Sequence, residues 1–105
     1  MAFDLIVGVG GKTGGAHEVV ACIDYHELPA LLCLVKRIDS FFLQRISNLF
    51  EDQVFSPEEV EQALSHLLPL LVEPGGAGEQ ALLHKLIAAL AYAKHKRLSL
   101  IGMAD

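Results

Sequence analysis

The chain has 105 residues, the length of one domain with a single hydrophobic core, so we expect residues 1–105 to form one domain. Its formal net charge of −5 at pH 7 disfavours nucleic acid and anionic membranes as partners, because both attract basic surfaces. Hydrophobic residues make up 52% of the chain, so either the core is unusually complete or another chain covers part of the apolar surface.

Two β-strand candidates open the chain and predict an N-terminal hairpin. The run from Phe3 to Val9 has β-branched residues and partial alternation, and the run from Glu18 to Tyr25 has a similar character. Gly8 either weakens the first strand or marks a bulge in it. The glycine-rich stretch from Gly10 to Ala16 would be the connecting loop.

Nothing in the sequence predicts export or membrane insertion. The N-terminus has no basic segment and carries Asp4, unlike a secretory signal, and no apolar run approaches the length that crosses a bilayer. Cys22 and Cys33 fit reduced thiols better than a disulfide framework, and we expect Cys33 to lie in the core. Together these features predict a cytoplasmic protein.

The hairpin is followed by a predicted helix that should begin near His26, which places Pro29 in its first turn. Asp24 and Glu27 also have the spacing of a capping box. The helix should end near Arg37, and its buried face would contain Leu28, Leu31, Leu32, Val35 and Ile38.

The next two helices have cap signals. Asp39 or Ser40 would cap a helix whose buried face contains Phe42, Ile46, Leu49 and Phe50. Residues 56–59, Ser-Pro-Glu-Glu, have the pattern of a capping box with proline at the first helical position, and they predict the start of the third helix. Its apolar face would contain Val60, Ala63, Leu64, Leu67, Leu68 and Leu71. Pro69 predicts a kink or an early end near Leu68.

The segment from Glu73 to Gly78 is a short linker, and a long helix should follow from about Glu79 to Arg97. Leu98 to Ile101 would add a short strand to the hairpin before Gly102 ends it. The predicted fold class is therefore α+β and mainly helical: an irregular four-helix bundle with an N-terminal β-hairpin and a short C-terminal strand.

No pattern in the chain predicts a reaction. Residues 10–13, Gly-Gly-Lys-Thr, follow a strand as in a phosphate-binding loop, but the glycine required five residues before Gly11 is Ile6. The candidate metal ligands match no common zinc spacing: His17, Cys22 and His26. Nothing places a cysteine or serine beside a histidine and an orienting acid. We therefore predict no catalytic residue, no metal site and no cofactor.

The uneven distribution of charge is the feature most relevant to function. Between Ile46 and His84 there is no lysine or arginine, whereas surface helices usually interleave both signs because opposite charges three or four residues apart attract. The acids in this stretch are Glu51, Asp52, Glu58, Glu59, Glu61, Glu73 and Glu79. They form either an ordinary solvated face or a surface that binds a partner. For the second case we predict the contact residues Glu51, Asp52, Phe55, Glu58, Glu59 and Glu61. The candidate apolar anchors beside the acids are Phe50, Val54 and Phe55.

The layout of the chain resembles small bacterial immunity proteins that are encoded beside polymorphic toxins. The similarity extends over the opening FDLIVGVGGK, the middle LQRISNLFEDQVFSPEEVEQAL and the closing LSLIGMAD, and it assigns a role to no single residue. It implies a compact, acidic, cytoplasmic protein that inhibits one cognate toxin by tight binding. If the toxin were a nuclease, its basic cleft would attract an acidic protein and speed their association.

Our leading hypothesis is a non-catalytic binding protein that neutralises a cognate toxin through the acidic region. One alternative is a homo-oligomeric structural or adaptor protein, such as a homodimer, that uses an apolar helix face. Another is a small nucleotide-dependent enzyme built around Lys12.

Overall fold

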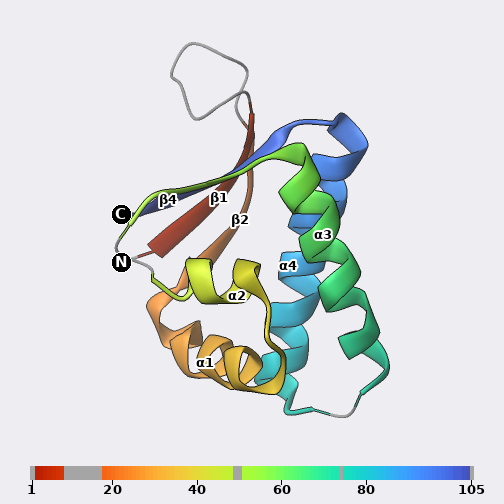
Figure 1. Cartoon of the computed structure of the whole chain (residues 1–105). Coiled ribbons are helices and arrows are strands. Elements are labelled where there is room, and N and C mark those ends of the chain that lie inside the picture. The colour runs from red at the N-terminus through yellow and green to blue at the C-terminus, as the bar shows by residue number, and fades with distance from the viewer. Residues whose placement is uncertain (1, 9–17, 49–50, 74, 105) are drawn as a thin grey trace.

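The computed structural model describes residues 2–8, 18–48, 51–73 and 75–104. These residues form an α+β fold that is mainly helical, with four α-helices and one four-stranded antiparallel sheet (Figure 1). The strands are β1 (Ala2–Gly8), β2 (Glu18–Asp24), β3 (Gln53–Phe55) and β4 (Ser99–Ala104). The helices are α1 (Leu28–Arg37), α2 (Phe41–Ile46), α3 (Pro57–Leu67) and α4 (Ala77–Lys96), with 3₁₀ helices η1 (Tyr25–Glu27) and η2 (Leu68–Val72). The predicted fold class is confirmed.

The strand order in the sheet is β2-β1-β4-β3, and every neighbouring pair is antiparallel. β1 and β2 form the predicted N-terminal hairpin, and β4 brings the C-terminal segment alongside β1, as expected. A bulge lies between Leu5 and Ile6, where Val20 of β2 is the extra residue, and not at Gly8. The predicted connecting loop, residues 10–16, lies outside the described residues.

The prediction that Gly102 ends the last strand was wrong, because β4 continues to Ala104. Gly102 pairs with Leu5 of β1 and with Gln53 of β3, inside the sheet. A Cβ atom at this position would overlap the ring of Phe3. Glycine is therefore required here by the close approach of an aromatic ring, and it does not act as a strand terminator.

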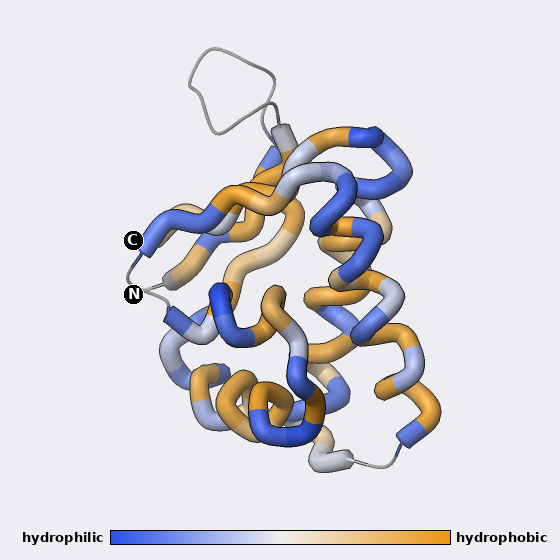
Figure 2. Tube along the Cα trace, in the orientation of Figure 1, coloured by the Kyte–Doolittle hydropathy of each residue, from blue (hydrophilic) through white to orange (hydrophobic). Residues whose placement is uncertain are grey.

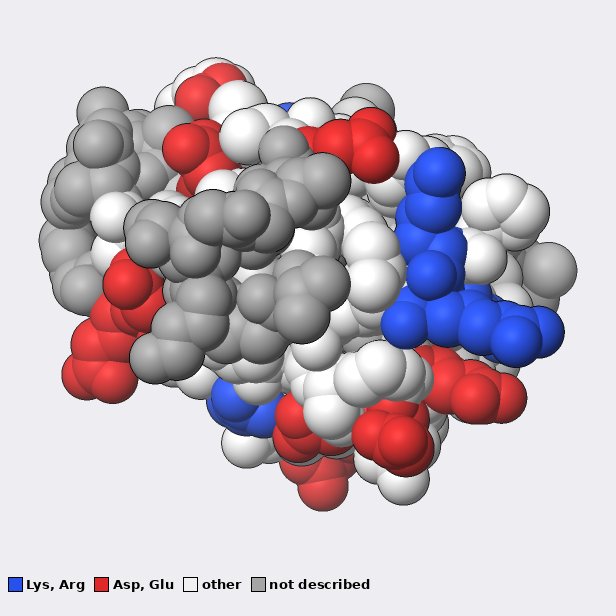
Figure 3. Space-filling view, turned by 90° about the horizontal axis from the view of Figure 1, so that it is seen from above, with Lys and Arg blue, Asp and Glu red and all other residues white. Residues whose placement is uncertain are grey.

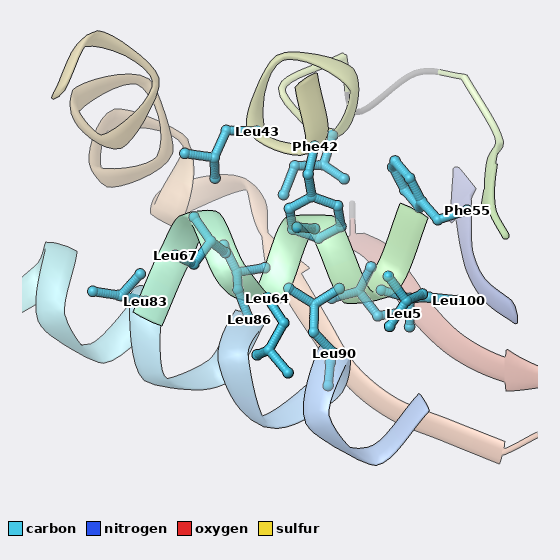
Figure 4. Packing of buried hydrophobic residues seen from close by; sticks show 14 of the residues in the cluster. Leu5, Phe42, Leu43, Phe55, Leu64, Leu67, Leu83, Leu86, Leu90 and Leu100 are labelled. Carbon is cyan, nitrogen blue, oxygen red and sulfur yellow. The ribbon is translucent and has the colours of Figure 1, made fainter. Parts of the chain in front are cut away.

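Helices α3 and α4 cover one face of the sheet. Phe3, Leu5 and Val7 alternate along β1, lie on that face and are almost completely buried. They belong to one hydrophobic core in which leucines of α3 lie opposite leucines of α4 (Figure 4). In Figure 2 the strands are predominantly hydrophobic, whereas the C-terminal end of α4 is hydrophilic.

The first two helices differ in detail from the sequence prediction. Asp24 and Glu27 do form a capping box, but it caps η1, and α1 begins afterwards at Leu28. In α1 the residues turned toward the core are Leu31 and Leu34, so Leu32 and Cys33 are exposed and not buried as expected. Helix α2 ends at Ile46, and the predicted face residues Leu49 and Phe50 lie outside the described residues.

Helix α3 begins as its sequence predicts. The Glu59 N–H donates to Ser56 Oγ at 3.2 Å, and the Ser56 N–H donates to Glu59 Oε1 at 3.0 Å, which completes the capping box. The buried residues of α3 are Val60, Ala63, Leu64 and Leu67. At Leu68 the chain tightens into η2, which contains Pro69, so the expected early end is confirmed, and Leu68 itself is exposed.

Helix α4 begins two residues earlier than expected and ends at Lys96. Tyr92 links it to the start of β2, because its hydroxyl donates to the Glu18 carboxylate at 2.8 and 2.9 Å, and this bond raises the pKa of the phenol. Arg97 follows in the left-handed conformation with φ 58°, a position at which glycine is usual. Among the described helices, α4 included, none combines the length and apolarity needed to cross a membrane.

Candidate functional site

The predicted interface residues lie on two consecutive elements, because β3 runs through Ser56 directly into α3. Glu51 and Asp52 precede β3 and are exposed. Glu58 and Glu61 are exposed on the first turns of α3, three residues apart and therefore on one side of the helix. Four of the six predicted residues thus face solvent and form what we call the acidic surface: Glu51, Asp52, Glu58 and Glu61.

Phe55 does not belong to this surface, and its prediction as an exposed anchor was wrong. Its side chain is 0% exposed, and its ring lies 4.8 Å from the ring of Phe42 and 6.4 Å from that of Phe41, measured between centroids. The alternation of β3 turns Phe55 into the core, so it turns the preceding residue, Val54, outward, where it is 42% exposed. Of the three candidate anchors, Val54 is therefore the one that a partner can contact, and Phe50 lies outside the described residues.

Glu59 has a structural role that the sequence shows only in part. Besides closing the capping box, its Oε2 accepts a bond from Arg45 Nη1 at 3.0 Å. The same guanidinium donates to Gln53 Oε1 at 3.1 Å and to the Val54 carbonyl at 2.9 Å, and it lies 4.3 Å above the Phe55 ring. Arg45 therefore joins α2, β3 and α3, and it neutralises Glu59.

Folding also brings an arginine to the far end of the acidic stretch. Arg37, at the end of α1, pairs with Glu73 at 3.4 Å and with Glu79 at 3.1 Å. Both arginines precede the stretch in sequence, and neither contact can be read from local spacing. The apparent excess of acid between Ile46 and His84 is thus smaller in space than along the chain.

The acidic surface is what remains after this pairing. Among the described residues, Glu51, Glu58 and Glu61 have no ion pair. Asp52 accepts a hydrogen bond from the Ala104 N–H at 2.7 Å, which ties the segment before β3 to the end of β4. The carboxylates of Glu58 and Glu61 therefore have no structural partner in the described part of the chain, and they are free to meet a cation from outside.

A basic patch lies at the end of α4. It consists of exposed residues in the last helical turn and just beyond: Lys94, His95, Lys96 and Arg97. Figure 3 shows a continuous group of basic side chains at this end of the molecule, with acidic side chains next to it. The lysines and the arginine of this patch stabilise the negative end of the α4 dipole, which is sufficient to explain their position.

A polar cluster at the end of β2 contains the residue types of a metal or catalytic site. Asp24, His26 and Glu27 have ligand atoms within 4.8 Å of one another, and Cys22 Sγ lies 4.0 Å from Asp24 Oδ1. The neighbour of the thiol is an aspartate, which is a weaker base than histidine, and no histidine hydrogen-bonds the thiol among the described residues. His17, the third candidate metal ligand considered in the sequence, lies outside the described residues.

Lys85 gives this cluster a structural role, because it joins α4 to the end of β2. Its ammonium donates to both carboxylate oxygens of Glu27, at 2.8 and 3.0 Å, and to the Cys22 carbonyl at 3.0 Å. Burial raises the pKa of Glu27, but the bonds from Lys85 and from the Asp24 N–H outweigh it and hold that pKa below its ordinary value. A divalent cation would have to displace the ammonium, so the cluster is a poor metal site.

Comparison of the chain with protein-family models, with curated proteins and with solved structures finds no match.

Proposed function

We propose that this chain is a non-catalytic binding protein that holds a basic protein partner against its acidic surface. The observation that carries the proposal is the position of Glu58 and Glu61. Ser56 and Glu59 already provide the capping bonds of α3, and the two other acids point to solvent without an ion pair among the described residues. Carboxylates in such positions attract a basic partner over a distance and speed its association.

The class of partner that we propose is a toxin whose active site carries positive charge, which the chain would neutralise in the cytoplasm as an immunity protein does. The resemblance in sequence layout supports this class. Val54 supports it physically, because tight binding needs an apolar contact close to the charged residues, and Val54 lies two residues after Asp52. The side chain of Glu59 is paired with Arg45 and would contribute little to binding the partner.

The test uses the protein encoded by the neighbouring reading frame as the probe. Its complex with the chain is measured by titration calorimetry at low and high salt. We expect binding that weakens with salt and falls about tenfold or more when Glu58 and Glu61 are both changed to lysine. Asp39→Lys reverses one charge at an exposed acid before α2 that accepts a hydrogen bond from Gln44, and as a control away from the acidic surface it should change binding little. Equal affinity of the Glu58 and Glu61 double variant and the wild type would rule out the acidic surface.

Self-association is the second candidate function, and it is favoured by exposed apolar side chains on helical segments. Leu32 on α1 and Leu68 and Val72 in η2 are all exposed. Light scattering coupled to size exclusion tests this candidate. A dimer that dissociates on Leu68→Lys would support an apolar helical interface, whereas a monomer at high concentration would exclude it.

A further inference from the structure

The face of the sheet opposite the core carries its own apolar row. Residues that are paired across an antiparallel ladder point to the same face. The pairings Val54 with Ile101, Ile101 with Ile6, and Ile6 with Val19 therefore place one residue from each strand side by side. None of the four belongs to the cluster of core residues between the sheet and the helices, although Ile101 is itself buried, and we call the four the apolar row.

The apolar row crosses the whole sheet, a width of about 14 Å between the outer strands. Its two ends are the most accessible, since Val19 is 64% and Val54 is 42% exposed, whereas Ile101 between them is 2% exposed. Met103, two residues further along β4, extends the same face and is 38% exposed. In Figure 1 the four helices lie to the right of and below the sheet, so no described helix covers this face. Single exposed apolar residues are ordinary, but Val19, Val54 and Met103 are three exposed apolar residues on one face of a small sheet, and together they offer a surface that a partner can contact.

Both edges of the sheet are closed to an added strand. On β2, Lys85 donates to the Cys22 carbonyl, and the Glu27 carboxylate accepts from the Asp24 N–H. On β3, which has three residues, Arg45 donates to the Val54 carbonyl. Occupied carbonyls, a bulge and a short edge strand all oppose strand addition. A partner must therefore lie on the face and not beside it.

Asp4 determines which partner fits this face. It lies on the central strand β1, pairs with Met103 and Cys22 across the ladders, and is half-buried. It has no ion pair with any described residue. A second copy packed sheet against sheet would bury two such carboxylates in one interface, which is costly without a cation. A partner that carries a lysine or arginine beside its apolar residues would satisfy Asp4.

We propose that this face docks an amphipathic helix of a protein partner, with apolar side chains over the apolar row and a basic side chain at Asp4. A helix is about 10 Å across, so one helix fits within the width of the row. The mode is that of a helix laid on an apolar surface, anchored by residues on one side. This site shares Val54 with the contact proposed beside the acidic surface, but it does not include Glu58 or Glu61, and it stands whether or not the chain binds a toxin.

The probe for the test is a synthetic amphipathic helix of leucine and lysine, and its binding is followed through the backbone amide spectrum. We expect the shifts to gather at Ile6, Val19, Val54, Ile101 and Met103. Val54→Lys, which adds a charge to an exposed position, should weaken binding about tenfold or more. Asp4→Asn should weaken it less, because it removes the ion pair and leaves the apolar contact.

Two controls distinguish docking on this face from binding at the acidic surface and from self-association. Val72→Lys adds the same charge at a position that is 88% exposed in η2 and should leave peptide binding unchanged. If Glu58→Gln weakens the peptide and Val54→Lys does not, the peptide binds the acidic surface and the proposal is overturned. It is also overturned if sedimentation shows a wild-type dimer that Val54→Lys dissociates, because a second copy then occupies the face. Thermal melts of each variant confirm that it is folded.

Discussion

At the scale of single residues, Ser40 shows how a cap position can be filled without a cap bond. It occupies the N-cap of α2 as expected, but its side chain is 0% exposed, makes no cap hydrogen bond, and has no partner for Oγ among the described residues. An unpaired buried hydroxyl costs free energy. We expect Ser40→Ala to leave the free energy of unfolding unchanged or to raise it by up to about 1 kcal/mol.

Ser56→Ala is the matched change at a cap that does bond, and it should lower the free energy of unfolding by about 1 kcal/mol. Urea denaturation of both variants measures the difference. A loss at Ser40 as large as that at Ser56 would show that the Ser40 hydroxyl has a partner after all.

Gly102 is the second position where one residue determines local structure. A methyl group there would meet the Phe3 ring in the middle of the sheet, where neither backbone can move freely. We expect Gly102→Ala to cost about 1–3 kcal/mol of unfolding free energy. Phe3→Leu in the same chain should recover part of that loss, so the two changes should not be additive.

Gly78→Ala provides the comparison for Gly102. Gly78 lies in the first turn of α4, and a Cβ atom there would sit 3.9 Å from the Cβ of Ala30, an ordinary contact. This change should stabilise the helix by about 0.5–1 kcal/mol. Thermal unfolding of the variants should therefore give shifts of opposite sign, and a Gly102→Ala variant as stable as the wild type would contradict the steric role of Phe3.

At the scale of elements, the features predicted correctly from the sequence are those that depend on local signals. The Ser56 capping box, the effect of Pro69 and the spacing of Asp24 and Glu27 each act within one or two turns, and each appears in the structure. β3 could not be predicted in the same way, because three residues are too few to show alternation and they pair only with the distant β4.

The candidate site was predictable to a similar extent. Exposure of Glu58 and Glu61 follows from the apolar face of α3, which turns them outward. The burial of Phe55 depends on β3, and the pairing of Glu59 depends on Arg45 of α2, so both require the tertiary fold. The apolar row was missed because it exists only through the register of four strands.

The Glu27–Lys85 ion pair joins the end of β2 to α4 and should make the stability of the fold depend on pH. The folded-state pKa of Glu27 lies below its ordinary value of 4.5, so its ionised form stabilises the fold above that pH. This contribution is lost as the pH falls from about 4.5 through the folded-state pKa. The difference in unfolding free energy between wild type and Glu27→Gln should therefore shrink on acidification.

Lys85→Gln provides the control for this ion pair, because it removes the cation and leaves the Glu27 carboxyl in place. In that background the Glu27→Gln difference should change less with pH than in the wild type. Denaturation curves recorded between neutral and acidic pH measure both differences. An equal pH dependence in the two backgrounds would show that Lys85 does not set the ionisation of Glu27.

At the scale of the whole molecule, charge and closed edges should keep the chain monomeric. The net charge of −5 disfavours close approach of two copies, and Lys85 and Arg45 occupy carbonyls on the two outer strands. Asp4 lies on the remaining apolar face of the sheet and opposes the packing of a second copy there, because two carboxylates would be buried. We therefore expect sedimentation equilibrium of the wild type to give the mass of one chain.

Asp4→Val should change this state. Valine suits a central strand and would make the sheet face opposite the core apolar along β1, so that the cost of burying two carboxylates disappears. Two copies could then pack sheet against sheet, and we expect a concentration-dependent dimer that Val54→Lys dissociates. Asp39→Val, at an exposed acid before α2, removes the same charge elsewhere and should leave the chain monomeric. A monomeric Asp4→Val protein would mean that the sheet face opposite the core is too small to hold a second copy even without its carboxylate, since stable interfaces bury about 800 Å² on each partner.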